Sequence, residues 1–330
     1  MGKTTLMDIA KELNVSKTTV SIVLNNKGKN IPEETKKKIF DKAKELNYIP
    51  NYLAKSLSMK KTFSIGVIVP TIDNPFFSEM VNAIEGVLNE NGYSMILCNT
   101  LNNEKREEEN IRLLINKAVD GIIVIPVNRQ FENVKILESN NIDFVLVDRV
   151  LEDEKKYNTV YCDSRLGIKL GIEYLLSKGH ENISFITKKP MKNEINVRLQ
   201  SYLENTEKIK NKYVVEEDIS MAGGFRATKE LMEKNKNIDA IFYSSDVMAF
   251  GGIKYLLRNG YKIPKDINVL GFDNIDICSF IEPELTTVAQ PISKMGVEGA
   301  KLLLKLINKE EVENKNIVMR PYLVERATVK

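Results

Sequence analysis

A group of polar side chains near the amino terminus is of the types that bind nucleic acid. The group consists of Lys17, Thr18, Thr19 and Ser21. Apolar Val20, Val23 and Leu24 recur at intervals that place all three on one face of a helix. The ammonium and hydroxyl groups then lie on the opposite, exposed face, where they can hydrogen-bond to base edges and phosphates.

The charge of the chain is divided unevenly. Residues 1–61 hold thirteen lysines, no arginine and six acids, a net charge of +7, whereas the whole chain carries +3. Residues 62–330 therefore carry −4. A basic block joined to a mildly acidic body is typical of a phosphate-binding head on a different kind of module. A solvated lysine-rich surface is the alternative, and charge by itself does not separate the two.

The polar group needs a helix that holds it, and capping residues predict one. Thr5 and Asp8 have the spacing of a capping box, which starts a first helix that runs to about Leu13. Ser16 offers an N-cap to the second helix, which carries the polar group. A third helix follows, with acids in its first turn and a buried stripe: Glu33, Glu34, Ile39, Ala43 and Leu46. Two short helices so tightly linked must cross steeply, which is the helix-turn-helix geometry that puts the second helix in the major groove.

The pattern of the sequence changes from Phe63 onward. Short apolar runs rich in β-branched residues recur there: FSIGVIVP, YSMILCN, DGIIVIP, IDFVLVD, ISFIT, DAIFY and INVLGF. Stretches with helical periodicity, such as 77–90 and 107–117, separate them. Buried strands that alternate with helices predict an α/β fold of doubly wound parallel sheets, and so many strands predict two lobes. A ligand is expected in the cleft at the carboxyl ends of the strands.

Several classes of function lack the residues they need. Cys98, Cys162 and Cys278 are widely separated and lie beside apolar residues, which indicates reduced core thiols and neither a metal site nor a disulfide framework. His180 is the single histidine, and Gly179 before it predicts a left-handed helix cap, so we expect a structural role for it. No GxGxxG follows an early strand and no GxxxxGKS/T occurs, so the usual cradles for dinucleotides and nucleoside triphosphates are missing. We expect no catalytic residue, no cofactor and no metal.

The first sixty residues resemble, nearly end to end, the DNA-binding head of the LacI/GalR family of repressors. The segments that carry the resemblance are TLMDIAKELNVSKTTVS, VLN, ELNYIPN and LAKSL, in the family's order and spacing. The resemblance implies phosphate contacts by Thr5, Ser16, Thr19, Ser21, Asn25, Thr35, Tyr48 and Asn51. It also implies that Lys17 and Thr18 read the bases. Ile22 departs from the family, which commonly has arginine or histidine there; isoleucine offers only apolar contact, for example to a thymine methyl group.

The segment NYLAKSL, from Asn51 to Leu57, resembles the hinge helix of the same family. A helix this short is unstable alone in water, so its ordering is expected to require DNA and a second subunit. The resemblance implies that Ala54 and Leu57 contact DNA, with Leu57 as a wedge that kinks the minor groove. A linker leucine that packs against its neighbours is the alternative.

The body resembles the effector-binding module of that family, which shares the periplasmic sugar-binding fold. The segments that carry this resemblance are NPFFSEMVNAIE, VDR, LLSKGHENISFI, SSDVMAFG, IPKDINVLGFD and LTTVAQPISKMG. The resemblance implies effector contacts by Phe76, Phe77, Asp148, Arg198, Ile219, Asp246 and Asp273. Charged hydrogen-bonding groups orient sugar hydroxyls, so Arg198, Asp246 and Asp273 would be the polar anchors. Phe76 and Phe77 would be the apolar walls, and Ile219 stands where relatives often have an aromatic lid.

Other roles for these residues stay open. Arg198 can be a surface arginine on a helix, and Asp246 and Asp273 can be a helix cap or part of a structural turn. Lys188 and Lys189 would favour an acidic sugar if either reaches the ligand.

These inferences predict the following organisation. We expect a helix-turn-helix domain over 1–49, a hinge helix and linker over 50–61, and an effector-binding and dimerisation domain over 62–330. The lobes of the last domain are expected over 62–160 with 289–318, and over 161–288 with 319–330. The amino terminus has acidic and polar residues where an export signal needs an apolar run, and no later window reaches membrane length, so we expect a cytoplasmic, nucleoid-associated protein without a membrane partner.

The chain is thus expected to be a sequence-specific transcriptional regulator, a repressor of carbohydrate-utilisation genes. It would bind a palindromic double-stranded operator as a homodimer under the control of a small carbohydrate effector, whose binding changes the separation of the two hinges. A sugar-binding or sugar-processing protein without DNA regulation is the alternative. The basic head and the missing nucleotide loop argue against it.

Overall fold

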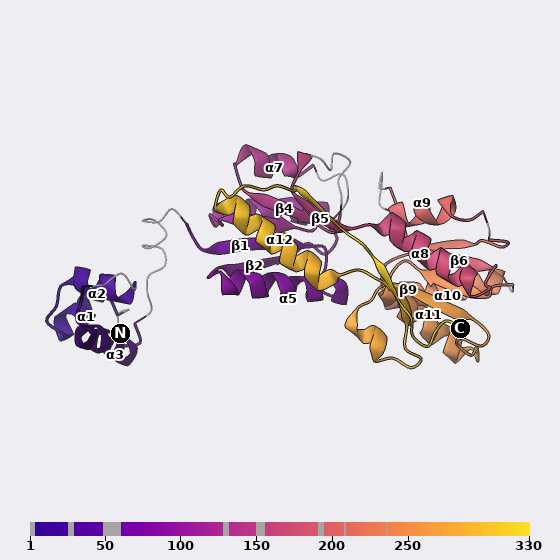
Figure 1. Ribbon diagram of the computed structural model, residues 1–330, viewed down its shortest axis with the longest axis horizontal. Helices are drawn as coiled ribbons and strands as arrows, with labels where there is room; N and C mark the ends of the chain where they lie inside the picture. Colours follow the sequence, from indigo (N-terminus) through magenta and orange to yellow (C-terminus); the bar gives the residue numbers. More distant parts are fainter. Residues whose placement is uncertain are drawn as a thin grey trace. The chain divides into compact units, whose positions relative to one another are not determined.

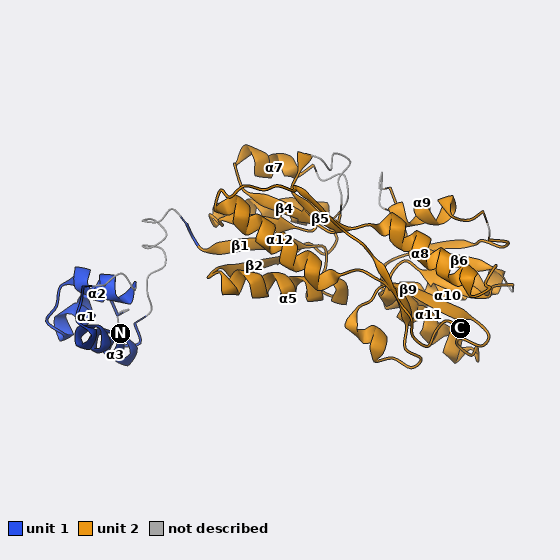
Figure 2. Cartoon of the chain, viewed as in Figure 1, with its two compact units in different colours: residues 1–62 blue, residues 63–330 orange. Residues whose placement is uncertain are grey.

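The computed structural model describes most of the chain. The described residues are 4–25, 30–48, 61–127, 132–149, 156–190, 195–207, 209–235 and 237–330. The chain divides into two compact units, residues 1–62 and residues 63–330 (Figure 2). Three of the residues predicted to contact DNA, Asn51, Ala54 and Leu57, lie outside the described residues.

The first unit contains the three predicted helices (Figure 1). They are α1 (Leu6–Glu12), α2 (Lys17–Leu24) and α3 (Glu33–Glu45). The predicted capping box is confirmed, because the Thr5 hydroxyl accepts from the Asp8 amide and the Asp8 carboxylate accepts from the Thr5 amide at 2.8 Å. Ser16 caps α2 as predicted, and its Oγ accepts the N–H of Thr19 at 3.0 Å. Hydroxyl and carboxylate caps thus fix where both helices of the motif begin.

A small apolar core holds the three helices together. Its buried side chains are Ile9, Ala10, Val20, Val23, Ile39 and Ala43. Between α1 and α2 the chain turns at Asn14, whose φ of +52° is one that asparagine tolerates better than most residues. Because the apolar face of α2 is used in this core, its polar face is left outward.

The second unit is built on two six-stranded sheets. The first has the order β11-β5-β4-β3-β1-β2, with strands β1 (Ser64–Val69), β2 (Ser94–Asn99), β3 (Gly121–Val124), β4 (Phe144–Val147), β5 (Thr159–Cys162) and β11 (Asn316–Met319). The second has the order β12-β10-β9-β8-β6-β7, with strands β6 (Ile183–Lys188), β7 (Val214–Glu217), β8 (Ala240–Tyr243), β9 (Asn268–Asp273), β10 (Thr286–Ala289) and β12 (Tyr322–Val324). Every pairing is parallel except that of β10 with β12. The predicted α/β fold with doubly wound parallel sheets is confirmed.

Helices cover both faces of each sheet (Figure 1). They are α5 (Pro75–Glu90), α6 (Glu104–Asn116), α7 (Val134–Ser139), α8 (Ser164–Ser177), α9 (Val197–Glu204), α10 (Met221–Lys234), α11 (Asp246–Arg258), the short 3-10 helix η2 (Asp276–Ser279) and α12 (Ile292–Ile307). On the first sheet, α5 and α12 pack on one face and α6 and α7 on the other. On the second, α8 and α9 face α10 and α11 across the strands. Among the described residues, no helix combines the length and the apolar character needed to cross a bilayer.

The seven apolar runs of the sequence correspond to β1, β2, β3, β4, β6, β8 and β9. The helical stretches expected over 77–90 and 107–117 begin earlier, at Pro75 and Glu104. Asn74 and Asn103 precede these helices and accept backbone N–H groups of their first turns, which sets the true starts. Gly179 adopts a φ of +88° after α8, so the predicted left-handed cap is confirmed.

The chain passes between the two sheets three times. It leaves the first sheet after β5, returns to it after β10, and leaves it again after β11. The domain bounds expected from the sequence remain a prediction. We propose that each of these three crossings is a boundary at which the chain leaves one lobe and enters the other.

Helices α10 and α11 approach each other closely through glycines. A Cβ atom added to Gly224 would lie 2.0 Å from the carbonyl oxygen of Met248, and one added to Gly251 would lie 1.9 Å from that of Met221. Both obstacles are backbone atoms, which cannot swing aside as a long side chain can. The contact therefore requires hydrogen in place of a methyl group at these positions.

We predict that Gly251→Ala lowers the free energy of unfolding by about 1–3 kcal/mol, the usual cost of overpacking a core. Gly86→Ala is the matched control, since Gly86 is a helical glycine of α5 with no atom within 4 Å of an added Cβ. That change should raise stability by roughly 0.5–1 kcal/mol, because alanine favours helix. Urea denaturation of both variants measures the two effects, and equal shifts would refute the packing argument.

Candidate functional site

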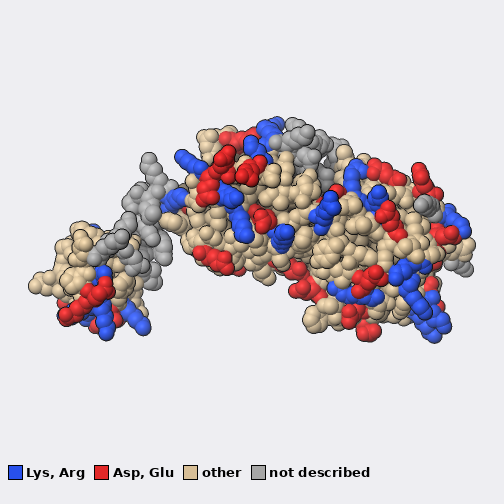
Figure 3. Space-filling view, in the orientation of Figure 1, with Lys and Arg blue, Asp and Glu red and all other residues tan. Residues whose placement is uncertain are grey.

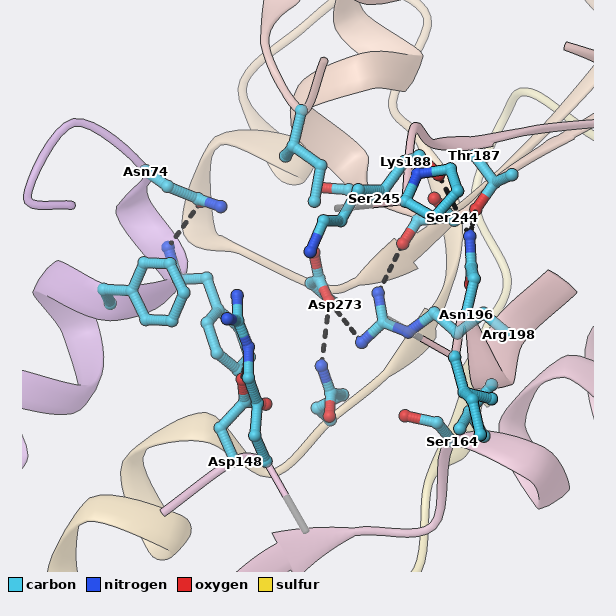
Figure 4. A pocket seen from close by; sticks show the side chains of 18 residues that line it. Asn74, Asp148, Ser164, Thr187, Lys188, Asn196, Arg198, Ser244, Ser245 and Asp273 are labelled. Carbon is cyan, nitrogen blue, oxygen red and sulfur yellow. Dashed lines mark hydrogen bonds and ion pairs between the residues drawn. The ribbon is translucent and has the colours of Figure 1, made fainter. Parts of the chain in front are cut away.

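A pocket of about 130 Å³ lies at the carboxyl ends of the strands of both sheets (Figure 4). Its lining residues come from the ends of β1, β4, β5, β6, β7, β8, β9 and β10 or from the segments that follow them. The pocket therefore lies at the strand ends, where parallel α/β sheets commonly bind ligands. Every predicted effector residue except Asp246 lines it: Phe76, Phe77, Asp148, Arg198, Ile219 and Asp273.

Arg198, in the first turn of α9, is held on three sides. Its guanidinium donates a hydrogen bond to the carbonyl oxygen of Ser244, and its Nη2 lies 3.5 Å from Oδ1 of Asp273 (Figure 4). The guanidinium carbon lies 4.0 Å from the centre of the Phe272 ring, within cation–π distance. With its side chain only 21% exposed, Arg198 presents a fixed fork of donors to the pocket.

Asp273 ends β9 in an unusual conformation. Its φ of +124° lies in the region that favours glycine, and Asn274 follows with a φ of +59°. Gln290 donates to Asp273 Oδ1 at 2.8 Å, on the same oxygen that faces Arg198. Burial raises the pKa of Asp273 to about 7, and the positive charge of Arg198 opposes that rise. The carboxyl group is thus buried, with a hydrogen bond from Gln290 and an ion pair with Arg198.

Asp246 is not among the residues that line this pocket, and the effector contact that the resemblance implies for it stays a prediction. It begins α11 fully buried, and its carboxylate accepts hydrogen bonds from the Thr287 hydroxyl at 2.6 Å, the Cys278 thiol at 3.1 Å and the Ile275 amide at 3.1 Å. Burial raises the pKa of Asp246, and these hydrogen bonds oppose the rise. Through these hydrogen bonds the carboxylate ties the turn that follows Asp273 to β10 and to the start of α11.

The first sheet contributes an apolar wall. Asn74 caps α5 by accepting the Phe76 amide at 3.1 Å, which sets the direction of the first turn. Phe76 and Phe77 then meet edge to face, with their ring centres 5.2 Å apart. Ile219, which is 38% exposed, adds an aliphatic surface from the segment before α10. A flat or apolar ligand surface has a matching wall here.

Polar lining residues that sequence analysis did not single out for binding complete the site. They include Arg149, Ser164, Thr187, Asn196, Ser244, Ser245 and Gln290. Gln290 directly follows β10, and Arg149 follows Asp148 after β4, so their places at strand ends are the signal that could have found them. Lys188 also lines the pocket, whereas Lys189 does not. Within the described ranges, no group of three or more His, Cys, Asp or Glu residues is arranged to hold a metal ion.

The polar face of α2 is the second candidate site. Ser16, Lys17, Thr18 and Asn25 are exposed, and Ile22 lies among them with 37% exposure. The remaining predicted contacts within the described residues differ in exposure: Thr5 is exposed, and Thr19, Ser21, Thr35 and Tyr48 are half-buried. An apolar side chain therefore lies among polar ones on the outward side of the helix.

The lysines of the head fall into two classes. Lys36, Lys38 and Lys42 of α3 lie 2.6–2.8 Å from acids of the same helix. Among residues 4–25 and 30–48, no ion pair joins Lys17. The Lys17 ammonium of α2 is thus available to an external anion. On the face of the second unit seen in Figure 3, by comparison, acidic and basic side chains are interspersed.

Two family models match the chain. The model described as bacterial regulatory proteins, lacI family, matches residues 5–51, and the periplasmic binding protein-like domain matches residues 172–329. The HTH-type transcriptional regulator RegA of Clostridium acetobutylicum is 37% identical over 98% of this chain and 99% of its own length. The ribose operon repressor of Halalkalibacterium halodurans is 35% identical over 99% and 97% of the two chains.

Solved structures agree with these matches. A lac repressor dimer bound to operator and the anti-inducer ONPF aligns with a TM-score of 0.87 and 26% identity, covering 99% of both chains. A LacI family transcriptional regulator from Enterococcus faecium with bound ribose aligns with a TM-score of 0.72 and 30% identity, over 81% of this chain and 98% of that one.

The raised pKa of Asp273 predicts a pH dependence of stability. The carboxyl group ordinarily ionises near 3.8 and in the folded protein near 7, so the folded state binds its proton more tightly. Its stabilising contribution is therefore complete below about pH 4 and is lost as the pH rises to 7. We predict that the difference in unfolding free energy, wild type minus Asp273→Asn, falls by a few kcal/mol between pH 4 and 7.5, at about 1.4 kcal/mol per pKa unit. Urea denaturation across this range is the measurement, and a constant difference would contradict the assignment.

Proposed function

The chain belongs to the lacI family of bacterial regulatory proteins, and from this we propose that it represses carbohydrate-utilisation genes under the control of a small sugar. The family consists of DNA-binding regulators, and we propose no catalytic step in the pocket. The observation that carries the proposal is the pairing, in one chain, of a helix with an exposed polar face and a pocket with a buried Arg198–Asp273 pair. The exposed polar side chains of the helix suit binding to DNA, and the buried charged pair of the pocket suits binding to a small polar ligand.

The pocket favours a neutral sugar of pentose or hexose size. The guanidinium of Arg198 and the carboxyl of Asp273 offer donors and acceptors side by side, which suits neighbouring hydroxyl groups. Phe76 and Phe77 offer an apolar surface for the carbon face of the ring. The ribose operon repressors and the ribose-bound regulators among the relatives support D-ribose as the first ligand to test. Lys188 in the lining supports acidic sugars as the second class.

On DNA, we propose that two copies of the chain bind the two halves of a palindromic operator. The lac repressor dimer on its operator supports this arrangement. Lys17 and Thr18 would read base edges, and Ile22 would contact a thymine methyl group. The phosphate-contacting set would be Thr5, Ser16, Thr19, Ser21, Asn25, Thr35, Tyr48 and Asn51, followed by Ala54 and Leu57 in the minor groove. A protein with this activity would be associated with the nucleoid.

The effector would act by linkage. A sugar that binds one arrangement of the two lobes more tightly shifts the population toward it. The factor by which the sugar changes operator affinity then equals the factor by which the operator changes sugar affinity. The decisive experiment is a thermal-shift screen of pentoses, hexoses and uronates on the full-length protein. Fluorescence anisotropy on an operator selected from random duplexes follows, with and without each hit. We expect a sugar that raises the melting temperature and changes operator affinity at least tenfold; stabilising sugars that leave DNA binding unchanged would reject the regulatory mechanism.

We predict that Arg198→Ala weakens sugar binding roughly 10- to 150-fold, the value of a charged hydrogen bond, and leaves sugar-free operator affinity unchanged. Arg112→Ala on α6 is the control, because this exposed arginine pairs only with Glu108 of the same helix in the described structure. Isothermal titration calorimetry measures both variants. Comparable losses in the two would argue against a ligand contact by Arg198.

We predict that Lys17→Ala lowers the preference for the operator over single-base variants of it by about 1–3 kcal/mol at the base it reads. Ser21→Ala, at a proposed phosphate contact, should weaken binding to all of these duplexes alike. Anisotropy titrations at one fixed salt concentration compare the two variants. A uniform loss for Lys17→Ala would reassign that residue to phosphate binding.

A further inference from the structure

Glu107 is a buried acid that the proposed ligand contacts do not use. It lies in the first turn of α6, in the charged run EKREEEN, yet it is only 2% exposed. Its neighbours Glu104 and Glu109 are exposed. A carboxylate removed from water is costly unless donors or an opposite charge compensate for the lost hydration. The role of Glu107 can therefore be inferred from the groups that its carboxylate contacts.

The carboxylate of Glu107 accepts hydrogen bonds from the segment after β3 and from the residue before α7. Oε2 of Glu107 accepts the Val127 amide at 2.7 Å, and Oε1 accepts the Asn133 side-chain amide at 3.1 Å. Burial raises the pKa of Glu107, whereas the two hydrogen bonds and the charge of Arg149 lower it. One residue before Val127, the carbonyl oxygen of Pro126 accepts a hydrogen bond from Arg149 Nη1 at 2.8 Å. Glu107 thus holds the backbone segment to which Arg149 is bonded.

Among the described residues of the first lobe, Arg149 is the cation that lines the pocket. Its side chain is 16% exposed, and its Nε lies 4.0 Å from Oδ2 of Asp148, which lines the same pocket. An arginine in a ligand pocket attracts anions unless nearby acids offset its charge. Glu107 and Asp148 are the acids placed to do so, and Glu107 acts from outside the lining.

We propose that Glu107 is a positioning residue that sets the charge selectivity of the effector site: it fixes Arg149 through Pro126 and offsets its charge, so that the pocket prefers neutral over anionic sugars. This inference rests on the proposed sugar-binding function. It predicts that loss of the Glu107 charge leaves Arg149 less compensated and less well fixed. Neutral-sugar affinity then falls, and the relative affinity for an anionic sugar rises.

The test measures the ratio of two dissociation constants, one for a neutral sugar and one for an anionic sugar. General destabilisation of the protein would not favour one of these sugars over the other. Calorimetry on the full-length protein gives the Kd values for D-ribose and for D-ribose 5-phosphate, which differ by one phosphate group. We expect Glu107→Gln to shift the Kd ratio about tenfold or more toward the phosphate ester, as expected for one uncompensated charge in a partly desolvated site.

Two controls separate charge from structure. Glu108→Gln removes the same charge from a side chain of α6 that is 42% exposed, where the acid pairs with Arg112. Asn133→Ala removes one hydrogen bond of Glu107 but leaves its charge in place. Both should keep the ratio within about twofold of wild type, and Asn133→Ala should lower the melting temperature. A Glu107→Gln variant that lowers the melting temperature without shifting the ratio overturns the proposal.

Arg149→Gln decides the question if Glu107→Gln does not fold. Removal of the cation should shift the ratio about tenfold toward D-ribose, and an unchanged ratio overturns the proposal. Wild-type protein that binds neither probe nor any other sugar would overturn the proposed function and this inference with it. A wild type that binds D-ribose, with ratios unmoved in the variants, rejects the inference alone.

Discussion

The polar side of the pocket depends on a carboxylate that does not line it. Asp246 accepts hydrogen bonds from β10, from the thiol of η2 and from the turn after β9, so three segments are fixed to the start of α11. This bracing allows Asp273 to hold a backbone conformation that L residues avoid. Arg198 is then fixed against Asp273, Ser244 and Phe272. Protein contacts thus hold both binding groups in place, and side chains fixed by the fold lower the entropic cost of binding.

Local signals in the sequence predicted a large part of this architecture. The capping box at Thr5 and the cap at Ser16 act over three residues, and the apolar runs report burial directly, so the helix starts of the head and the strands β1 and β9 could be found. Strand β7, with the sequence VVEE, lies at a sheet edge with two exposed residues and gives no such run. Short apolar runs predict a strand only where both faces are covered.

The site was harder to predict than the fold because its bonds join distant parts of the chain. Asp246 and Thr287 lie 41 positions apart, and nothing local to either residue indicates that the carboxylate bonds to this hydroxyl and does not line the pocket. Arg198 and Asp273 were found through family resemblance, and Gln290 was missed although it lies at a strand end. Position at a strand end indicates access to the cleft, while the direction of each side chain is decided by its tertiary partners.

The three passages of the chain between the sheets have a mechanical consequence. Each lobe contains segments from distant parts of the sequence, so neither lobe is a single continuous piece. A protease that cut any one of the passages would leave two covalent links, and the lobes would stay joined. Because all three passages join the same two lobes, a rotation of one lobe against the other must change the backbone angles of all three segments together.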